Sequence, residues 1–149
     1  MKMNNDLKIL AKTIYGEARG ELNPFGLAPL IAVGNVVINR VRKKFEKSIT
    51  DVCLAPRQFS CWNHDDPNYE KIKNLDESSS LFKTYLEIAR NLIEGSWPDL
   101  TDGCDHYHAR YVKPFWAGML TPKRVFGNHL FYSLKNLLSK DGEYKWKKI

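Results

Sequence analysis

The sequence lacks three features that would each indicate a particular class of protein. No apolar run approaches the roughly 20 residues that a membrane-spanning helix needs, and no leader with an apolar core opens the chain. No internal repeat or low-complexity segment is found. We therefore expect a single domain over residues 1–149, with no membrane partner, made in the cytoplasm without a signal peptide.

Cysteine is also scarce, and its spacing argues against a disulfide framework. The thiols of Cys53, Cys61 and Cys104 cannot all pair within one chain, and none belongs to a CxxC motif. A Cys53–Cys61 bridge formed after export is an alternative. We expect all three to pack as small hydrophobic side chains, because a chain of 149 residues can bury a core without help from disulfides or metal.

The net charge of +6 is unevenly distributed along the chain. Residues 1–63 carry ten basic and five acidic side chains, residues 64–105 carry four and ten, and residues 106–149 carry nine and two. Basic ends around an acidic middle fit an anionic polymer such as nucleic acid or cell wall, and equally fit a protein that its charge keeps in solution. No known nucleic-acid-binding motif stands out, so we expect no nucleic-acid partner.

Hydrophobic spacing predicts three main helices. The first begins after an N-cap at Asn5 or Asp6 and ends near Glu17, and the second covers about residues 27–44. The third follows caps at 76–79 and stops at Gly95. The second helix is long and apolar, so we expect it to be buried at the centre of the domain, with its basic end matching the helix dipole.

The remaining segments predict less regular structure. Residues 46–75 are expected to form a helical turn at 50–54 and then an irregular polar loop. Short strands are expected at 105–108 and 128–132. The pattern as a whole predicts a mainly helical α+β domain with a small β element.

Glu17 is the first candidate for chemistry, because its helical spacing places it on the apolar stripe of the first helix. A carboxyl group held against apolar surface loses hydration in its charged form and so keeps its proton, as a general acid must. A surface glutamate paired with Lys12 or Arg19 is the ordinary alternative. Glu21 is the competing carboxylate, and we expect it to be exposed.

Two further clusters could bind a ligand. The segment 58–62 (QFSCW) offers an amide, a hydroxyl and an indole, which suit a carbohydrate cleft or simply a core contact. Zinc could be held by Cys104 with His106 and His108, which share one face of a strand, or by a wider set that includes His129, His64, Asp65 and Asp66. No HExxH motif supports this, so we expect no metal.

Six segments occur in an order that carries a family resemblance: 11–21 (AKTIYGEARGE), 32–41 (AVGNVVINRV), 58–62 (QFSCW), 106–109 (HYHA), 114–116 (PFW) and 127–132 (GNHLFY). Over about residues 7–133 the chain resembles the cell wall hydrolase family typified by the spore cortex-lytic enzyme catalytic domain, which leaves a C-terminal tail at 134–149. The resemblance implies a lysozyme-like catalytic domain with a substrate groove for the glycan strands of peptidoglycan.

The resemblance also implies a mechanism. Glu17 matches the family's catalytic glutamate, which would protonate the β-1,4 oxygen between N-acetylmuramic acid (MurNAc) and N-acetylglucosamine (GlcNAc). It would then take the proton of the muramic C6 hydroxyl, giving the 1,6-anhydro product of a lytic transglycosylase. No cofactor is implied, and we expect a monomer. The substrate-binding candidates are Gln58, Ser60 and Tyr107, which would orient the sugar, and Asn39, Trp62, His129 and Tyr132, which would line or support the cleft.

Several alternatives stay open. Muramidase-type hydrolysis of the same bond normally uses a second carboxylate, and none stands in a family motif here. A non-catalytic wall-binding module and a zinc-dependent amidase or nuclease are alternatives of other classes. The lack of a wall-binding repeat or export signal suggests a phage endolysin or a phage-derived gene, whose product acts on the wall after release or export.

Overall fold

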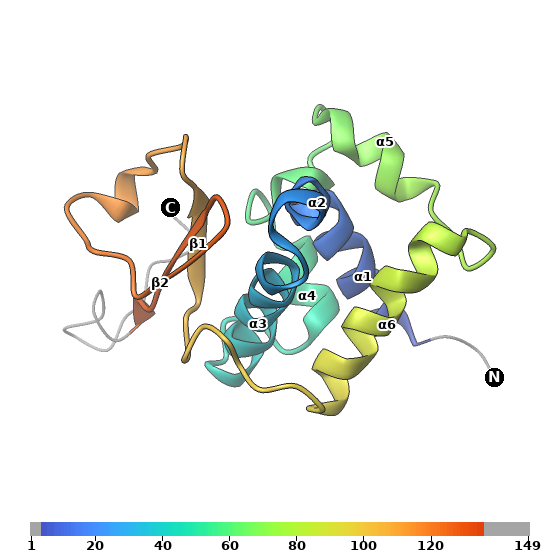
Figure 1. Ribbon diagram of the computed structural model, residues 1–149, viewed down its shortest axis with the longest axis horizontal. Helices are drawn as coiled ribbons and strands as arrows, with labels where there is room; N and C mark the ends of the chain where they lie inside the picture. The colour runs from blue at the N-terminus through green and yellow to red at the C-terminus, as the bar shows by residue number, and fades with distance from the viewer. Residues whose placement is uncertain (1–3, 136–149) are drawn as a thin grey trace.

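The structure is a computed structural model that describes residues 4–135. Its α-helices are α1 (Asn5–Ala18), α2 (Leu22–Phe25), α3 (Ala28–Arg42), α4 (Ile49–Leu54), α5 (Pro67–Lys73) and α6 (Ser80–Glu94). Its 3-10 turns are η1 (Arg19–Glu21), η2 (Ser60–Trp62) and η3 (Phe115–Ala117), and its strands are β1 (His106–Ala109), β2 (Arg124–Phe126) and β3 (His129–Tyr132). The sheet lies on one side of the helical part, next to α3 (Figure 1). The expected mainly helical α+β class is confirmed.

Helix α1 begins one or two residues earlier than predicted. Its N-cap is Asn4, whose side chain accepts a hydrogen bond from the backbone N–H of Asp6 at 2.7 Å. The expected cap at Asn5 or Asp6 is therefore wrong. Asp6 instead accepts hydrogen bonds from the N–H and hydroxyl of Thr50, at 2.9 and 2.6 Å, and so joins the start of α1 to α4.

Helix α3 is buried along most of its length, as its hydrophobicity predicts. It contacts α1, α4 and α6 on one side and strands β1 and β2 on the other. Gly34 allows the close approach of α6, because a Cβ there would overlap the Leu92 side chain. The third predicted helix is α6, which runs from the N-cap Ser79 to Gly95 in the left-handed conformation. Helix α3 therefore links the helical part to the sheet.

The segment 46–75 is more regular than its polar composition predicts. The expected turn at 50–54 is α4, but the expected loop contains η2 and the two-turn helix α5. Asp66 caps α5 by accepting from the N–H of Asn68 at 2.8 Å, and Pro67 occupies the first helical position. An Asp-Pro pair is a helix-start signal, so the start of α5 could have been predicted from the sequence.

The three strands form an antiparallel sheet in the order β1-β3-β2. The two expected strands are β1, which is shifted by one residue at both ends from its predicted range, and β3, which begins one residue later than predicted. Strand β2 was not predicted, because three residues with Arg124 and Val125 exposed give no alternating pattern. The hairpin between β2 and β3 turns at Gly127, which has a φ of 58°.

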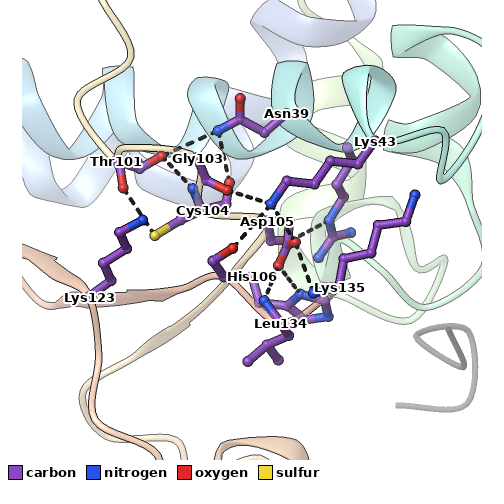
Figure 2. A network of polar contacts seen from close by, with 12 residues as sticks. Asn39, Lys43, Thr101, Gly103, Cys104, Asp105, His106, Lys123, Leu134 and Lys135 are labelled. Atoms are coloured by element: carbon purple, nitrogen blue, oxygen red, sulfur yellow. Dashed lines mark hydrogen bonds and ion pairs between the residues drawn. The ribbon is translucent and has the colours of Figure 1, made fainter. Parts of the chain in front are cut away.

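A buried carboxylate fastens the start of β1 to α3. Asp105 accepts hydrogen bonds from Lys43 Nζ and His106 Nδ1, both at 2.8 Å, and from the backbone N–H of Leu134 and Lys135 (Figure 2). These donors lower the pKa of Asp105 against the opposing effect of burial. The predicted tail at 134–149 thus begins with two residues held by the domain, and its residues 136–149 lie outside the described part.

The three cysteines are free and buried, as expected. Burial raises the pKa of the Cys53 thiol to about 12 and that of the Cys104 thiol to about 11. Over residues 4–135, none of the helices is both long and apolar enough to cross a membrane.

Candidate active site

Glu17 occupies the last turn of α1, where that helix meets η2. The preceding Gly16 makes this contact possible, because a Cβ on it would lie 2.6 Å from Cys61 Cβ and 2.8 Å from Cys61 Sγ. Real carbon atoms do not approach so closely, so any larger residue would push the turn away. The missing side chain at position 16 therefore brings the Ser60–Trp62 turn against the Glu17 carboxyl group.

Three donors point at the Glu17 carboxyl group. The phenol of Tyr107 donates to Oε1 at 2.5 Å, and the backbone N–H of Cys61 donates to Oε2 at 3.1 Å. The Ser60 hydroxyl lies 3.5 Å from Oε2. Burial and the nearby Glu17 charge raise the pKa of Tyr107 well above its usual 10, so the phenol keeps its proton. The carboxyl group is thus half-buried and held in place by fixed donors from two sides.

The strand pairing explains which sheet residues reach this site. Tyr107 pairs with Phe131, and Ala109 pairs with His129, so that Tyr107 and His129 project from the same face of the sheet. Their ring centroids are 5.2 Å apart. His106 and His108 project from the opposite face, where both rings contact Trp116. His106 and His108 therefore share one face of the strand, as their spacing predicts, but this face packs against the Trp116 ring.

A cavity of about 450 Å³ adjoins Glu17. Its lining combines residues of α1, α3, α5 and the segment that ends in η2 with residues of β1, β3 and the segment that follows β1. Of the predicted site residues, Glu17, Gln58, Ser60, Tyr107 and His129 line it together. The volume lies within the range of small-molecule binding sites, and the half-buried carboxyl group forms part of its lining.

The cavity wall carries positive charge from two arginines. Arg40 is buried, and its Nε donates to the Asp105 carbonyl at 2.7 Å while its guanidinium lies over the Phe59 ring at 5.2 Å. Arg57 is exposed at the rim and has a left-handed φ of 61°. Among the lining residues that the structure describes, Glu17 supplies the one carboxyl group. An anionic ligand is therefore favoured by the charge of the wall.

His129 is the buried neutral group of the site. It is 6% exposed, and its Nδ1 has no hydrogen-bond partner among residues 4–135. Burial lowers its pKa below the usual 6.5, although the charges of Glu21 and Glu17 oppose this. An uncharged imidazole therefore lies in the cavity wall beside Tyr107.

Three of the predicted substrate-binding residues are not among those that line the cavity. Asn39 is buried and donates to Asp99 Oδ2 at 2.8 Å and to the Cys104 carbonyl at 2.9 Å, because α3 turns it toward the segment before β1. The indole of Trp62 donates to Thr13 Oγ1 at 2.9 Å and so joins η2 to α1.

Tyr132 is the third of these residues. It projects from the outer face of the sheet, where its hydroxyl lies 2.8 Å from His108 Nε2. All three residues hold elements of the site in position, which is the supporting role that the sequence analysis allowed for them.

Glu21 is buried rather than exposed, which corrects the prediction. Its carboxylate accepts from the backbone N–H of Asn128 at 2.6 Å and from Asn128 Nδ2 at 3.1 Å. A Cβ on Gly127 would lie 2.5 Å from Glu21 Oε1. The carboxylate therefore fixes the turn that leads into His129, and the long separation in sequence hid this contact from pattern analysis.

The residues considered for zinc do not converge. His106 Nδ1 is bonded to Asp105, His108 lies between the Ala109 carbonyl and Tyr132, and Cys104 Sγ contacts the Thr101 carbonyl. Within the described residues, no group of three potential ligands is arranged to hold a metal ion.

Sequence analysis missed several lining residues. Arg40 was counted only with the basic end of the second helix, although its spacing from Val33 and Val37 places it on the apolar face of α3. The other missed polar or aromatic residues come from separate segments, and no local pattern identifies them: Arg57, Asn68, His108 and Trp116.

The fold and the site together define a class of protein: a mainly helical domain with a glutamate in a cavity between its helices and a small sheet. The same fold is found in the catalytic domain of the germination-specific lytic transglycosylase SleB from Bacillus anthracis, with a TM-score of 0.66. The match covers 87% of this chain and 95% of that domain, at 23% sequence identity.

The family follows from the sequence comparison. The family model described as Cell Wall Hydrolase matches residues 28–132, so the chain belongs to that family. The spore cortex-lytic enzyme of Bacillus subtilis (strain 168) is 38% identical over 58 residues, which are 38% of this chain and 18% of that relative. Glu17 lies before the range that the family model matches, so its assignment depends on the geometry of the cavity.

Proposed function

We propose that the protein cleaves the β-1,4 bond between MurNAc and GlcNAc in the glycan strands of peptidoglycan. It acts as a lytic transglycosylase and releases a 1,6-anhydromuramic end. Membership of the Cell Wall Hydrolase family supports the substrate class. The names of the relatives, a spore cortex-lytic enzyme and a lytic transglycosylase, support the reaction.

One observation carries the choice of reaction. Glu17 is the single carboxyl group among the described residues that line the cavity. A hydrolytic glycosidase normally uses two carboxyl groups, one as acid and one as base or nucleophile. Glu21 cannot take the second role, because its two oxygens hold the turn at Asn128. A single carboxyl group suffices when the sugar's own hydroxyl is the nucleophile.

The proton then follows a closed route. Protonated Glu17 gives its proton to the glycosidic oxygen as the bond from that oxygen to the muramic C1 breaks. The muramic C6 hydroxyl attacks C1, and its proton passes to the Glu17 carboxylate. The Cys61 N–H, the Tyr107 phenol and the Ser60 hydroxyl hold that carboxyl group through both steps. Glu17 ends the cycle protonated, as it began.

The Gln58 amide and the buried His129 imidazole, which line the same cavity, are the proposed contacts for the acetamido group and the reacting sugar. We also propose that the protein works as a monomer and reaches the wall after phage lysis or export. No cofactor enters the mechanism.

The decisive experiment is mass spectrometry of the fragments released from purified peptidoglycan. We expect muropeptides lighter by one water than the hydrolytic products, and a loss of about 10²- to 10⁴-fold in rate for Glu17→Gln. Circular dichroism of that variant should match the wild type. Glu70→Gln, at an exposed position of α5, is the matched control.

The other outcomes identify the alternatives. Fragments with a full reducing end would make the protein a muramidase and remove the transglycosylase reaction. Sedimentation with cell walls without any released fragment would make it a binding module. Activity that is lost to chelators and restored by metal would indicate a zinc-dependent amidase or nuclease.

A further inference from the structure

The segment that follows β1 presents large apolar side chains to solvent beside the cavity. Tyr111 is 81% exposed, and Phe115 and Met119 are fully exposed. Figure 1 shows this segment in orange on the side of the sheet away from α5 and α6. Clustered exposed apolar residues on a protein of this size mark binding surfaces more often than chance.

This exposure belongs to an ordered part of the chain. Three backbone hydrogen bonds form successive turns, from Val112 N–H to the Ala109 carbonyl, from Ala117 N–H to Pro114 and from Leu120 N–H to Ala117, at 2.9, 3.0 and 2.7 Å. Trp116 packs edge-on against the rings of His106 and Tyr132. The turns are thereby anchored to the sheet, and the neighbouring Phe115 ring is held outward.

The same turns also form part of the cavity wall. Val112, Pro114 and Trp116 line the cavity that contains Glu17, while Tyr111 and Phe115 alternate with them in sequence and lie outside it. A ligand that is longer than the cavity and leaves it past Val112 and Pro114 passes next to the residues that carry the exposed rings. Arg110 and Lys113 are exposed on the same segment and add positive charge.

We propose that Tyr111 and Phe115 form an outer binding surface on which sugar rings of the glycan strand stack beyond the cavity. The proposal rests on the proposed function, since it extends that site to a longer stretch of the same polymer. The apolar face of a pyranose packs against an aromatic ring, and Arg110 and Lys113 suit the carboxylates of the wall's peptide stems. Continuity with the cavity wall favours a glycan over a lipid surface, to which basic and aromatic residues could also bind.

The test compares the Tyr111→Ala/Phe115→Ala double variant with the wild type. Binding to purified sacculi is measured by sedimentation in a Glu17→Gln background, so that no turnover interferes. Fragment release is measured in the active protein, on sacculi and on a short oligosaccharide of four sugars. Leu81→Ala, which removes a half-exposed apolar side chain from α6, is the control.

We expect the double variant to bind sacculi about tenfold more weakly, with KM raised and kcat retained, and with a larger effect on sacculi than on the short substrate. Equal binding by the double variant and the Leu81→Ala control would overturn the proposal. So would a loss of binding to vesicles of anionic phospholipid without a loss on sacculi, which would make this surface a membrane contact. If the wild type releases no fragments from sacculi, the proposed function fails, and the sedimentation comparison still decides whether the rings bind glycan.

Discussion

The cavity around Glu17 has two walls. The helical wall comes from α1, α3, α5 and the segment that ends in η2, and the sheet wall comes from β1, β3 and the segment that follows β1. The helical wall depends on the close packing of Gly16 against the Cys61 side chain. The sheet wall depends on alternating side chains of paired strands, and Asp105 fastens those strands to α3. Close packing at Gly16 holds the helical wall together, and the buried Asp105 carboxylate holds the sheet wall. We therefore expect a different substitution to disrupt each wall.

Replacement of the buried charge should give the largest loss of stability. In Asp105→Asn, Lys43 and His106 lose a charged partner in a buried setting, and we expect the free energy of unfolding to fall by about 3–5 kcal/mol. Urea unfolding at pH 7 measures this. Asp102→Asn is the matched control, because that carboxylate is two-thirds exposed in its ion pairs with Lys123 and Arg124. Equal losses in the two variants would show that Asp105 does not anchor the sheet.

The same carboxylate predicts the response to acid. The folded pKa of Asp105 lies below its usual 3.8, so its contribution to stability is complete above about pH 4 and is lost as the pH falls further. We expect the free energy of unfolding to decline below pH 4, and to decline less steeply in Asp105→Asn than in the wild type.

A side chain added at Gly16 should disrupt the packing of the helical wall against Cys61. Gly16→Ala places a methyl group 2.6 Å from Cys61 Cβ, and we expect a loss of about 1–3 kcal/mol together with reduced activity. Gly20→Ala is the control, since a Cβ at Gly20 meets nothing within 4 Å. Thermal unfolding and fragment release are the two measurements. A fully active and stable Gly16→Ala protein would contradict the description of this wall.

Tyr107 tests the point where the two walls meet. Tyr107→Phe removes the donor to Glu17 Oε1, and we expect activity to fall by about tenfold while stability changes by about 1 kcal/mol. Tyr132→Phe removes a hydroxyl from the outer face of the sheet, where it bonds to His108. Its effect on activity should be smaller, and the reverse order would place the important phenol on the other face.

The smallest expected effect is the loss of stability when His129 of the sheet wall is protonated. His129 is buried with a pKa lowered below 6.5, so the neutral form stabilises the fold above about pH 6.5, and that stability is lost as the pH falls. We expect unfolding to cost about 1 kcal/mol less at pH 5.5 than at pH 7.5, with a smaller difference in His129→Gln. His106 contributes with the same sign, because burial also lowers its pKa. His64→Gln, at an exposed position, should keep the full difference.

The two walls also differ in how far the sequence predicts them. Helices α1, α3 and α6 were predicted closely because their apolar residues repeat with the helical period. Glu17 followed from that period, while Gln58 and Ser60 followed from a segment rich in hydrogen-bonding groups. The close contact at Gly16 was not predictable in detail, since it depends on where η2 folds back.

The sheet wall was predicted in part. Its strands β1 and β3 were found, but the expected exposure of Glu21 is wrong. The hydrogen-bond partners of Glu21, Asn39 and Tyr132 could not be predicted, because each partner lies far away in sequence. A buried amide and a ligand-binding amide look alike until the partner is known. Long-range pairing is the information that composition and periodicity lack.

The rate at which the buried thiols react with an alkylating reagent reports how often the fold opens locally. Alkylating reagents attack the thiolate, and burial raises the pKa of all three thiols, which suppresses that form in the closed protein. Each thiol should therefore react only when its neighbourhood opens, Cys61 beside Gly16 and Cys104 beside Asn39. The order in which peptides containing Cys61 and Cys104 gain mass would show whether the helical part or the segment before β1 opens first.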